Sequence, residues 1–264
     1  TTLNMKRIDE LDYIKKNSLA HGKLYPYKNI DKIEYEVKSI DGIDYVYKIS
    51  NKYIPYLYLD GDVVTDKYKN YRYNTLDNSL IENAEIEGYS DEALNELGID
   101  GNLESDEVVI VNSLANYNAE GQLENIDFTN LKEGDTIKVA RSSIEVHAVE
   151  NLDEVNENLE KDKTSNDFIE FKVKKIINRS PFDYDFSTTF KIIMNFNSFN
   201  NFYDENDYST TIGFRYKDVN DEKSIEKTAE KINNIAENNE ITFSDINKDN
   251  QSDEEMWNVI NVFI

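Results

Sequence analysis

The chain has 264 residues, no cysteine and a formal net charge of −24 at pH 7, from 53 acidic and 29 basic side chains. The lack of cysteine excludes disulfide bonds, thiolate catalysis and cysteine-based metal centres. The acidic excess argues against binding to nucleic acid or to anionic lipid surfaces, because both depend on Lys and Arg. With 18 Tyr and 12 Phe, a chain of this length can bury a substantial core, as one large domain or two small ones.

The N-terminal part of the chain is predicted to form a helix followed by two strands. Between residues 30 and 40 the apolar side chains recur at helical spacing, and Gly42 stands where a glycine would end the helix. Residues 43–50 and 52–60 are rich in Tyr, Ile and Val and predict two strands. Pro55 indicates an edge or a bulge in the second strand.

From about residue 63 to residue 177 the pattern is typical of short strands separated by turns. The predicted strands are residues 79–87, 107–111, 136–140, 144–149 and 168–177. A short helix is predicted at residues 91–97, with Ser90 as its N-cap. Residues 151–166 are acidic and polar, and they predict a loop or a frayed helix.

The last third predicts a strand, a helix and a further strand. Residues 189–194 and 210–216 form predicted strands, and 240–243 another. Apolar residues between Ile225 and Ala236 mark one face of an amphipathic helix, capped by Asn220 or Asp221. We interpret strand, helix and strand as a βαβ unit with parallel strands and a right-handed crossover.

The predicted fold class is α+β, with a discontinuous arrangement of the chain. Residues 1–62 and 188–264 are expected to build one α/β layer from both ends of the chain. Residues 63–187 are expected to form a β-rich subdomain inserted between them.

Three segments of the middle region have a recognisable order. Residues 104–115 read Glu-Ser-Asp-Glu-Val-Val-Ile-Val-Asn-Ser-Leu-Ala, and residues 131–139 read Leu-Lys-Glu-Gly-Asp-Thr-Ile-Lys-Val around a turn at Gly134. Some thirty residues later, 171–177 place Phe, Val, Ile and Ile in a third strand. This order resembles the extracellular core domain of FtsX-like, MacB-like ABC transporter permeases. The resemblance covers most of the chain and is weakest before Tyr27.

The resemblance implies a non-enzymatic extracellular domain of a membrane protein. Such a domain would couple ATP hydrolysis by a cytoplasmic ABC ATPase partner to substrate export or to regulation of an extracellular partner. Residues 1–62 and 188–264 would be the membrane-proximal, porter-like subdomain, and residues 63–187 the distal one. Flanking membrane helices would anchor the domain at the extracellular face of the cell membrane, in a permease dimer. The richness in Asn, Lys, Ile, Tyr and Asp fits a low-GC Gram-positive source.

The apolar run at residues 256–264 has two interpretations. It matches the first turns of a membrane helix, or a terminal helix docked on the domain with Trp257 and Ile260 facing inward. The second interpretation agrees with an alternative function, a secreted or surface-anchored ligand-binding module or adhesin.

The sequence offers no catalytic or cofactor-binding signature. His21 and His147 are far apart, and neither has the neighbouring ligands of a zinc site. There is no nucleophile elbow and no phosphate-binding glycine loop, and the chain has only 9 Gly. We therefore expect no enzyme activity, no cofactor and no ATP binding.

Residues 245–253 contain the best candidate for a metal site, a calcium loop. The candidate ligands at positions 1, 3, 5 and 9 of that loop are Asp245, Asn247, Asp249 and Asp253. Asn250 replaces the turn glycine, however, and Met256 stands in place of the bidentate glutamate. We therefore expect no metal site, and a polar linker is the alternative for this segment.

Tyrosines are concentrated between residues 45 and 73. They are Tyr45, Tyr47, Tyr53, Tyr56, Tyr58, Tyr68, Tyr71 and Tyr73. Tyrosine suits a binding surface, because its ring gives apolar contact and its hydroxyl a hydrogen bond. The alternative is one face of a sheet packed on its neighbour.

Overall fold

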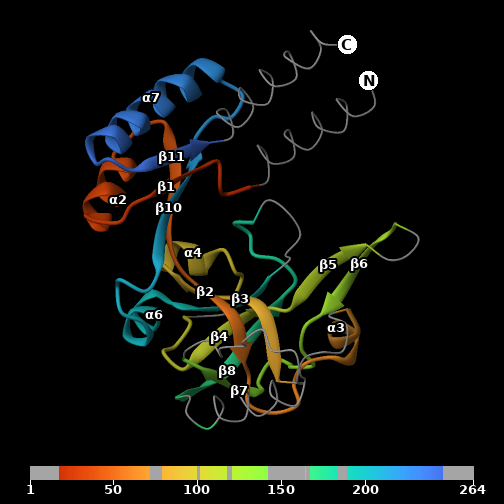
Figure 1. Cartoon of the computed structure of the whole chain (residues 1–264). Coiled ribbons are helices and arrows are strands. Elements are labelled where there is room, and N and C mark those ends of the chain that lie inside the picture. Colours follow the sequence, from red (N-terminus) through yellow and green to blue (C-terminus); the bar gives the residue numbers. More distant parts are fainter. Residues whose placement is uncertain are drawn as a thin grey trace, which may run out of the picture. The chain divides into compact units, whose positions relative to one another are not determined.

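The computed structural model describes residues 18–71, 79–99, 102–117, 121–141, 164, 167–183 and 189–245 (Figure 1). Unit 1 comprises Thr1–Ile49, Pro181–Tyr184 and Ser209–Ile264, and unit 2 comprises Ser50–Ser180 and Asp185–Tyr208. The domain boundaries expected from the sequence, after residues 62 and 187, both lie within unit 2. Helices and a large mixed sheet confirm the predicted α+β class.

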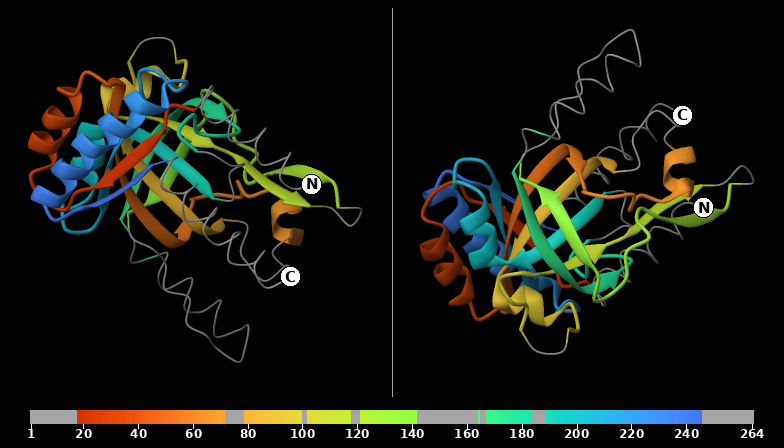
Figure 2. Two further views of the ribbon diagram at one scale, coloured as in Figure 1. Left: turned by 90° about the horizontal axis from the view of Figure 1, so that it is seen from above. Right: turned by 90° about the horizontal axis from the view of Figure 1, so that it is seen from below.

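Unit 1 is a sheet covered by two helices. Its strand order is β11 (Thr242–Asp245), β1 (Gly22–Tyr25), β10 (Ser209–Tyr216) and the first part of β2 (Ile43–Tyr58). The helices α2 (Ile30–Lys38) and α7 (Glu222–Asn238) lie side by side on one face of this sheet (Figure 2). The packing agrees with the predicted inward face of α7, because Ile225, Ile232 and Ala236 are buried against the strands.

The ends of both helices follow from local sequence. The Asp221 side chain accepts a hydrogen bond from the backbone N–H of Ser224 at 3.2 Å, which caps α7 as predicted. Helix α2 ends earlier than predicted, at Lys38, with Ser39 as its C-cap. The prediction for Gly42 was therefore wrong. Gly42 lies in the turn before β2, where an added Cβ would be 1.9 Å from Thr228 Oγ1 of α7.

The predicted βαβ unit needs a correction. Strands β10 and β11 have the same direction, but β1 lies between them and is antiparallel to both. Strand β1 was not predicted, since it has four residues and begins with a glycine. That glycine is required by packing, because a Cβ on Gly22 would be 2.2 Å from the ring of Phe214 on the paired strand.

A second correction concerns β2. The two strands predicted at residues 43–50 and 52–60 are one continuous strand, Ile43–Tyr58, which contains Pro55. The residue between the two predicted strands, Asn51, is extended and lies in the middle of β2.

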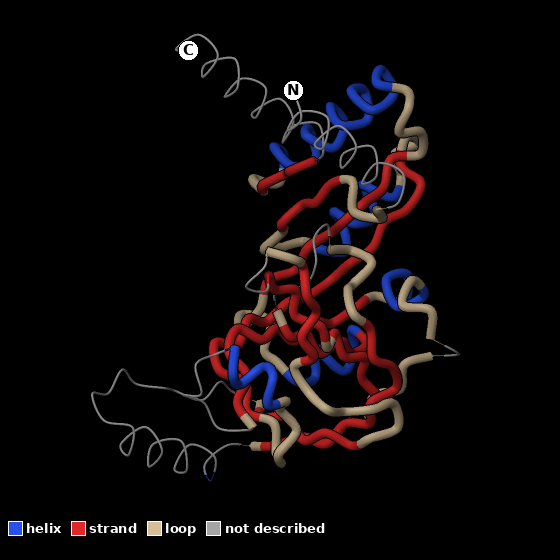
Figure 3. Tube along the Cα trace, turned by 90° about the vertical axis from the view of Figure 1, so that its right-hand side faces the viewer, coloured by secondary structure: helices blue, strands red, loops and turns tan. Residues whose placement is uncertain are grey.

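Unit 2 is built on a strongly curved sheet (Figure 3). From β2 the strand order is β3 (Leu80–Tyr89), β9 (Phe190–Asn195), β4 (Glu107–Val111), β8 (Phe168–Ile177) and β7 (Thr136–Ala140). Just after β2, Leu59 pairs with Val139 of β7, and the Asp60 N–H donates to the Lys138 carbonyl at 3.0 Å. The last strand of the order, β7, thus contacts the residues that follow β2, and the curved sheet encloses an apolar core.

The predicted strands of unit 2 agree closely with those observed. The predictions for β4, β7 and β8 are confirmed to the residue, and those for β3 and β9 within two residues at each end. The predicted strand 144–149 and, apart from residue 164, the predicted loop 151–166 lie outside the described residues. Helix α4 (Asp91–Asn95) has Ser90 at its N-cap position, as predicted, but the Ser90 side chain forms no capping hydrogen bond and the helix ends two residues earlier than predicted.

Four further elements of unit 2 were not predicted. They are α3 (Asp66–Tyr71), α6 (Phe196–Phe202) and a hairpin of β5 (Ser113–Tyr117) and β6 (Leu123–Asp127). Throughout the described part of the chain, no helix has both the length and the apolar character needed to cross a membrane.

Candidate functional site

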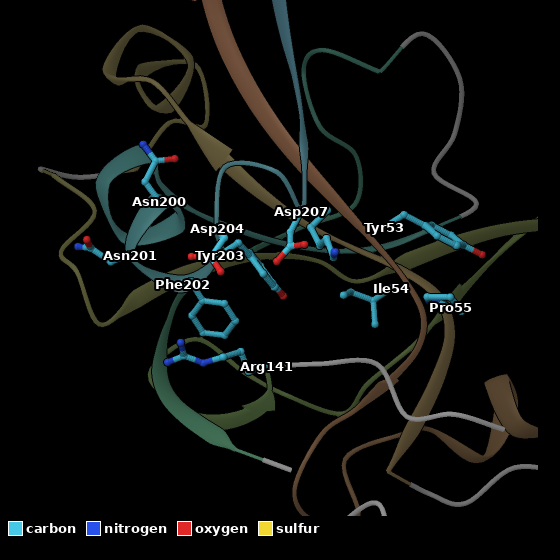
Figure 4. Close-up of a pocket in the computed structure, with 11 residues that line it drawn as sticks. Tyr53, Ile54, Pro55, Arg141, Asn200, Asn201, Phe202, Tyr203, Asp204 and Asp207 are labelled. Atoms are coloured by element: carbon cyan, nitrogen blue, oxygen red, sulfur yellow. The ribbon is translucent and has the colours of Figure 1, made fainter. Parts of the chain in front are cut away.

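A groove of about 540 Å³ in unit 2 is the candidate functional site (Figure 4). It is lined by Lys52, Tyr53, Ile54, Pro55, Arg141, Asn200, Asn201, Phe202, Tyr203, Asp204 and Asp207. These residues come from the middle of β2, from the residue after β7, and from the end of α6 with the turn that follows. Segments far apart in the sequence therefore meet at one concave surface.

Helix α6 places two adjacent aromatic rings in the groove. The helix begins at Asn195, whose side chain accepts a hydrogen bond from the Ser198 N–H at 2.8 Å. It ends at Phe202, and the N–H of Tyr203 donates to the carbonyl of Phe199 at 3.0 Å. The rings of Phe202 and Tyr203 have centroids 4.8 Å apart at 62°, an edge-to-face arrangement.

Two cations lie over these rings. The guanidinium carbon of Arg141 is 5.1 Å from the centre of the Phe202 ring, and Lys52 Nζ is 5.9 Å from the centre of the Tyr203 ring. Both distances fall within the range of cation–π attraction. Arg141 Nε also lies 3.6 Å from a carboxylate oxygen of Asp167, which is longer than a hydrogen bond.

The hydroxyl of Tyr203 is the most unusual polar group of the groove. Tyr203 is only 8% exposed, and its hydroxyl has no hydrogen-bond partner among the described residues. Burial raises the pKa of Tyr203 above its ordinary value, while the positive charge of Arg141 acts in the opposite direction. At neutral pH the group is therefore a protonated phenol, able to donate and to accept a hydrogen bond.

The charges of the lining cancel. Lys52 and Arg141 contribute two positive charges, and Asp204 and Asp207 two negative ones, although the chain as a whole carries −24. Among the described residues, neither the two aspartates nor Lys52 forms an ion pair. Figure 4 shows Arg141 on one side of the Phe202 ring, and Tyr203, Asp204 and Asp207 on the other side. Arg141 thus lies apart from the two aspartates, with the Phe202 ring between them, and the second cation, Lys52, lies over the Tyr203 ring.

The calcium candidate is placed only in part. Asp245 is 2% exposed, and its carboxylate accepts a hydrogen bond from the Tyr216 hydroxyl at 2.6 Å. Asn247, Asp249 and Asp253 lie outside the described residues. Among the residues that are described, no three or more His, Asp or Glu side chains are grouped as metal ligands would be.

The two histidines do not form a site in the described chain. His21 is fully buried in unit 1, where its Nδ1 accepts a hydrogen bond from the Tyr216 N–H at 3.1 Å. His147 lies outside the described residues, as do Trp257 and Ile260. His21 is therefore part of the core of unit 1.

The tyrosine-rich segment contributes mostly to packing. Tyr47 and Tyr58 of β2 are buried, in agreement with the sheet-face alternative, whereas Tyr68 is buried on helix α3. Tyr53 is 52% exposed and lines the groove. Sequence reasoning found Tyr53 as one candidate of many, but it missed the groove, because Arg141 and the Phe202–Tyr203 pair belong to distant segments without a spacing motif.

Comparison with known proteins identifies no family for the chain. No protein-family model matches it, and no curated protein matches it in sequence. Among solved structures, the chain is similar to the periplasmic region of MacB from Actinobacillus actinomycetemcomitans, with a TM-score of 0.40 and 10% sequence identity. That match covers 93% of this chain and 98% of the other.

Proposed function

We propose that this chain is the extracellular domain of an ABC transporter permease. The observation that carries the proposal is the pairing of β1 with β11, in which Gly22 lies opposite Asp245. Paired strands are about 4.7–4.9 Å apart. The first and the last strand of the described chain are therefore neighbours in unit 1. A domain inserted between two membrane helices needs this arrangement, because packed helices have axes roughly 8–10 Å apart.

The sequence resemblance supports the same proposal. Its three segments, residues 104–115, 131–139 and 171–177, include β4 and most of β7 and β8. In the sheet these strands are neighbours, in the order β4, β8, β7. Segments that are separate in the sequence thus form one continuous part of unit 2, as a shared structural module would require.

Under this proposal the domain is not an enzyme. A separate cytoplasmic ABC ATPase hydrolyses ATP, and membrane helices on both sides of this domain carry the motion to it, in a permease dimer. Unit 1 is the membrane-proximal part and the inserted unit 2 the distal part. The domain then passes the motion to an exported substrate or to an extracellular partner, in a low-GC Gram-positive bacterium.

The groove favours a second candidate, a secreted or surface-anchored ligand-binding module. A concave, partly aromatic surface with a few convergent polar groups is typical of ligand sites. This candidate needs no membrane helix.

The coding sequence on either side of these residues separates the two candidates. The permease proposal predicts an apolar stretch of about 20 residues on each side, the length that crosses a bilayer as a helix. Polar sequence or a stop codon on both sides would contradict the permease and leave the ligand-binding module.

A further inference from the structure

We infer that the groove of unit 2 binds a small zwitterion whose carboxylate and ammonium groups are joined by an apolar body. The inference concerns only the chemistry of the groove and holds for either candidate function. It rests on the distribution of charge along the groove, on the aromatic rings between the charges and on the buried hydroxyl of Tyr203.

The two ends of the groove recognise opposite charges. Arg141 offers a planar group with several N–H donors, and its contact with Asp167 at 3.6 Å leaves these donors available to a carboxylate. Asp204 and Asp207 are exposed carboxylates that form no ion pair inside the described chain, and they match an ammonium group. The ring of Phe202 lies between Arg141 and the two aspartates, which are next to Tyr203 (Figure 4).

The middle of the groove suits an apolar body. Phe202 and Ile54 are buried side chains that also line the groove. The hydroxyl of Tyr203 lies among them without a hydrogen-bond partner in the described chain. A buried polar group without a partner has an energetic cost, because it has lost its hydrogen bonds to water. A ligand carboxylate or ammonium that reached this hydroxyl would remove that cost.

Ligands with a single net charge fit less well. The chain carries −24, so its long-range field repels an anion. A cation would have to compete with Arg141 and Lys52, which already lie over the aromatic rings. A zwitterion is neutral overall and satisfies both ends of a lining whose own charges cancel.

The test compares three probes with the same six-carbon body on the full 264-residue chain. The probes are 6-aminohexanoate, hexanoate and hexylamine, and binding is followed by ligand-observed NMR and by titration calorimetry. We expect 6-aminohexanoate to bind about tenfold more tightly than either singly charged probe, because each lacks one charge-assisted hydrogen bond. Equal binding of all three probes, or no binding at about 10 mM, would overturn the inference.

Variants then locate the site. Arg141→Gln should reduce the affinity for 6-aminohexanoate to that for hexylamine, and the double variant Asp204→Asn, Asp207→Asn should reduce it to that for hexanoate. Tyr203→Phe keeps the ring and should weaken binding by about tenfold. The matched controls, Arg179→Gln and Asp62→Asn, change exposed residues of unit 2 outside the groove and should bind like the unchanged chain. Loss of affinity in a control, or unchanged affinity in every groove variant that keeps its melting temperature, would place the ligand elsewhere.

Discussion

Tyr216 joins three strands of unit 1 through two hydrogen bonds. Its backbone N–H donates to His21 Nδ1 at 3.1 Å, immediately before β1, and its hydroxyl donates to Asp245 at the end of β11 at 2.6 Å. The ring of His21 also stacks on that of Tyr216, with centroids 6.1 Å apart. Tyr216 thus holds together β1 and β11, the first and last strands of the described chain.

Replacing Tyr216 by Phe should therefore destabilise unit 1. The change removes the hydroxyl that donates to the buried carboxylate of Asp245, at a cost of about 1–3 kcal/mol. Urea unfolding measures this difference. Tyr25→Phe on β1 is the control, because Tyr25 is 44% exposed and its change should have little effect. Equal stability of the two variants would show that the hydrogen bond contributes nothing.

The same residue predicts a dependence of stability on pH. Burial, and then the negative charge and hydrogen bond of Asp245, raise the pKa of Tyr216 above that of an unfolded tyrosine. A group whose pKa is raised by folding stabilises the protein below its unfolded pKa, about 10, and loses this contribution as the pH rises further. The free energy of unfolding should decrease above about pH 10, and less steeply in Tyr216→Phe. Identical slopes in both chains would contradict this linkage.

At the scale of elements, α7 holds unit 1 together by one apolar face. Ile225, Ile232 and Ala236 are spaced for a single side of the helix and are buried against strands β10 and β11. The opposite side of α7 is exposed and charged. Removing the apolar face should therefore cost far more stability than changing the exposed one.

Ile232→Asp tests this packing. It places a charge without a partner in the core of unit 1 and should lower the free energy of unfolding by about 3 kcal/mol or more. Asn234→Asp adds the same charge to an exposed position of the same helix and should change stability by less than about 0.5 kcal/mol. An unchanged melting temperature for Ile232→Asp would show that the inward face of α7 is wrongly assigned.

Strands β3 and β9 of unit 2 are joined by a buried cluster of charges. Lys191 Nζ lies 3.1 Å from a carboxylate oxygen of Glu87 and 3.3 Å from one of Glu85. Glu87 also accepts hydrogen bonds from Asn51 at 3.3 Å and from Tyr89 at 3.0 Å. The side chains of Lys191 and Glu87 are 10% and 6% exposed, so water screens this pair little.

Lys191→Met should consequently destabilise unit 2 by about 3–5 kcal/mol, because it leaves the buried carboxylate of Glu87 without its counter-charge. The matched control is Lys172→Met on β8, where the side chain is exposed. Thermal unfolding of both variants checks the prediction. A loss in Lys191→Met no larger than in the control would mean that the pair contributes no net stability.

Elements with a local sequence pattern could be predicted, and elements that depend on contacts between distant residues could not. Residues 107–111 and 136–140 have local patterns, an apolar run and an alternation after a turn, and their strands were predicted to the residue. Strand β1 was missed because its pairing, not its composition, makes it a strand. The hairpin of β5 and β6 was missed because Ser, Asn and Glu interrupt its apolar residues.

The candidate site could not be predicted from local patterns, because its residues are distant in the sequence. Lys52, Arg141 and Tyr203 are separated by 60 residues or more and meet only in the folded unit 2. No local spacing connects them. The calcium candidate, in contrast, was suggested by a local spacing. Its first residue, Asp245, is buried in unit 1 and hydrogen-bonded to Tyr216.

For the whole molecule, we propose an extracellular domain that is joined to the membrane on both sides. The chain leaves unit 1 for unit 2 and returns to unit 1, whose strands β1 and β11 are paired. An inserted domain of a permease needs such a path. Location and attachment to the membrane are properties of the expressed protein, and intact cells are needed to measure them.

Single cysteines make that test possible, because the chain has none of its own. Tyr35→Cys on α2 and Leu123→Cys on β6 replace side chains that are 74% and 43% exposed, one in each unit. Intact cells that express the full-length gene are treated with a maleimide that cannot cross membranes, and their membranes are then washed with high salt and carbonate. We predict that both cysteines are labelled before lysis and that the labelled protein stays in the washed membranes. Labelling that requires lysis, or a labelled protein released by the wash, would contradict the account.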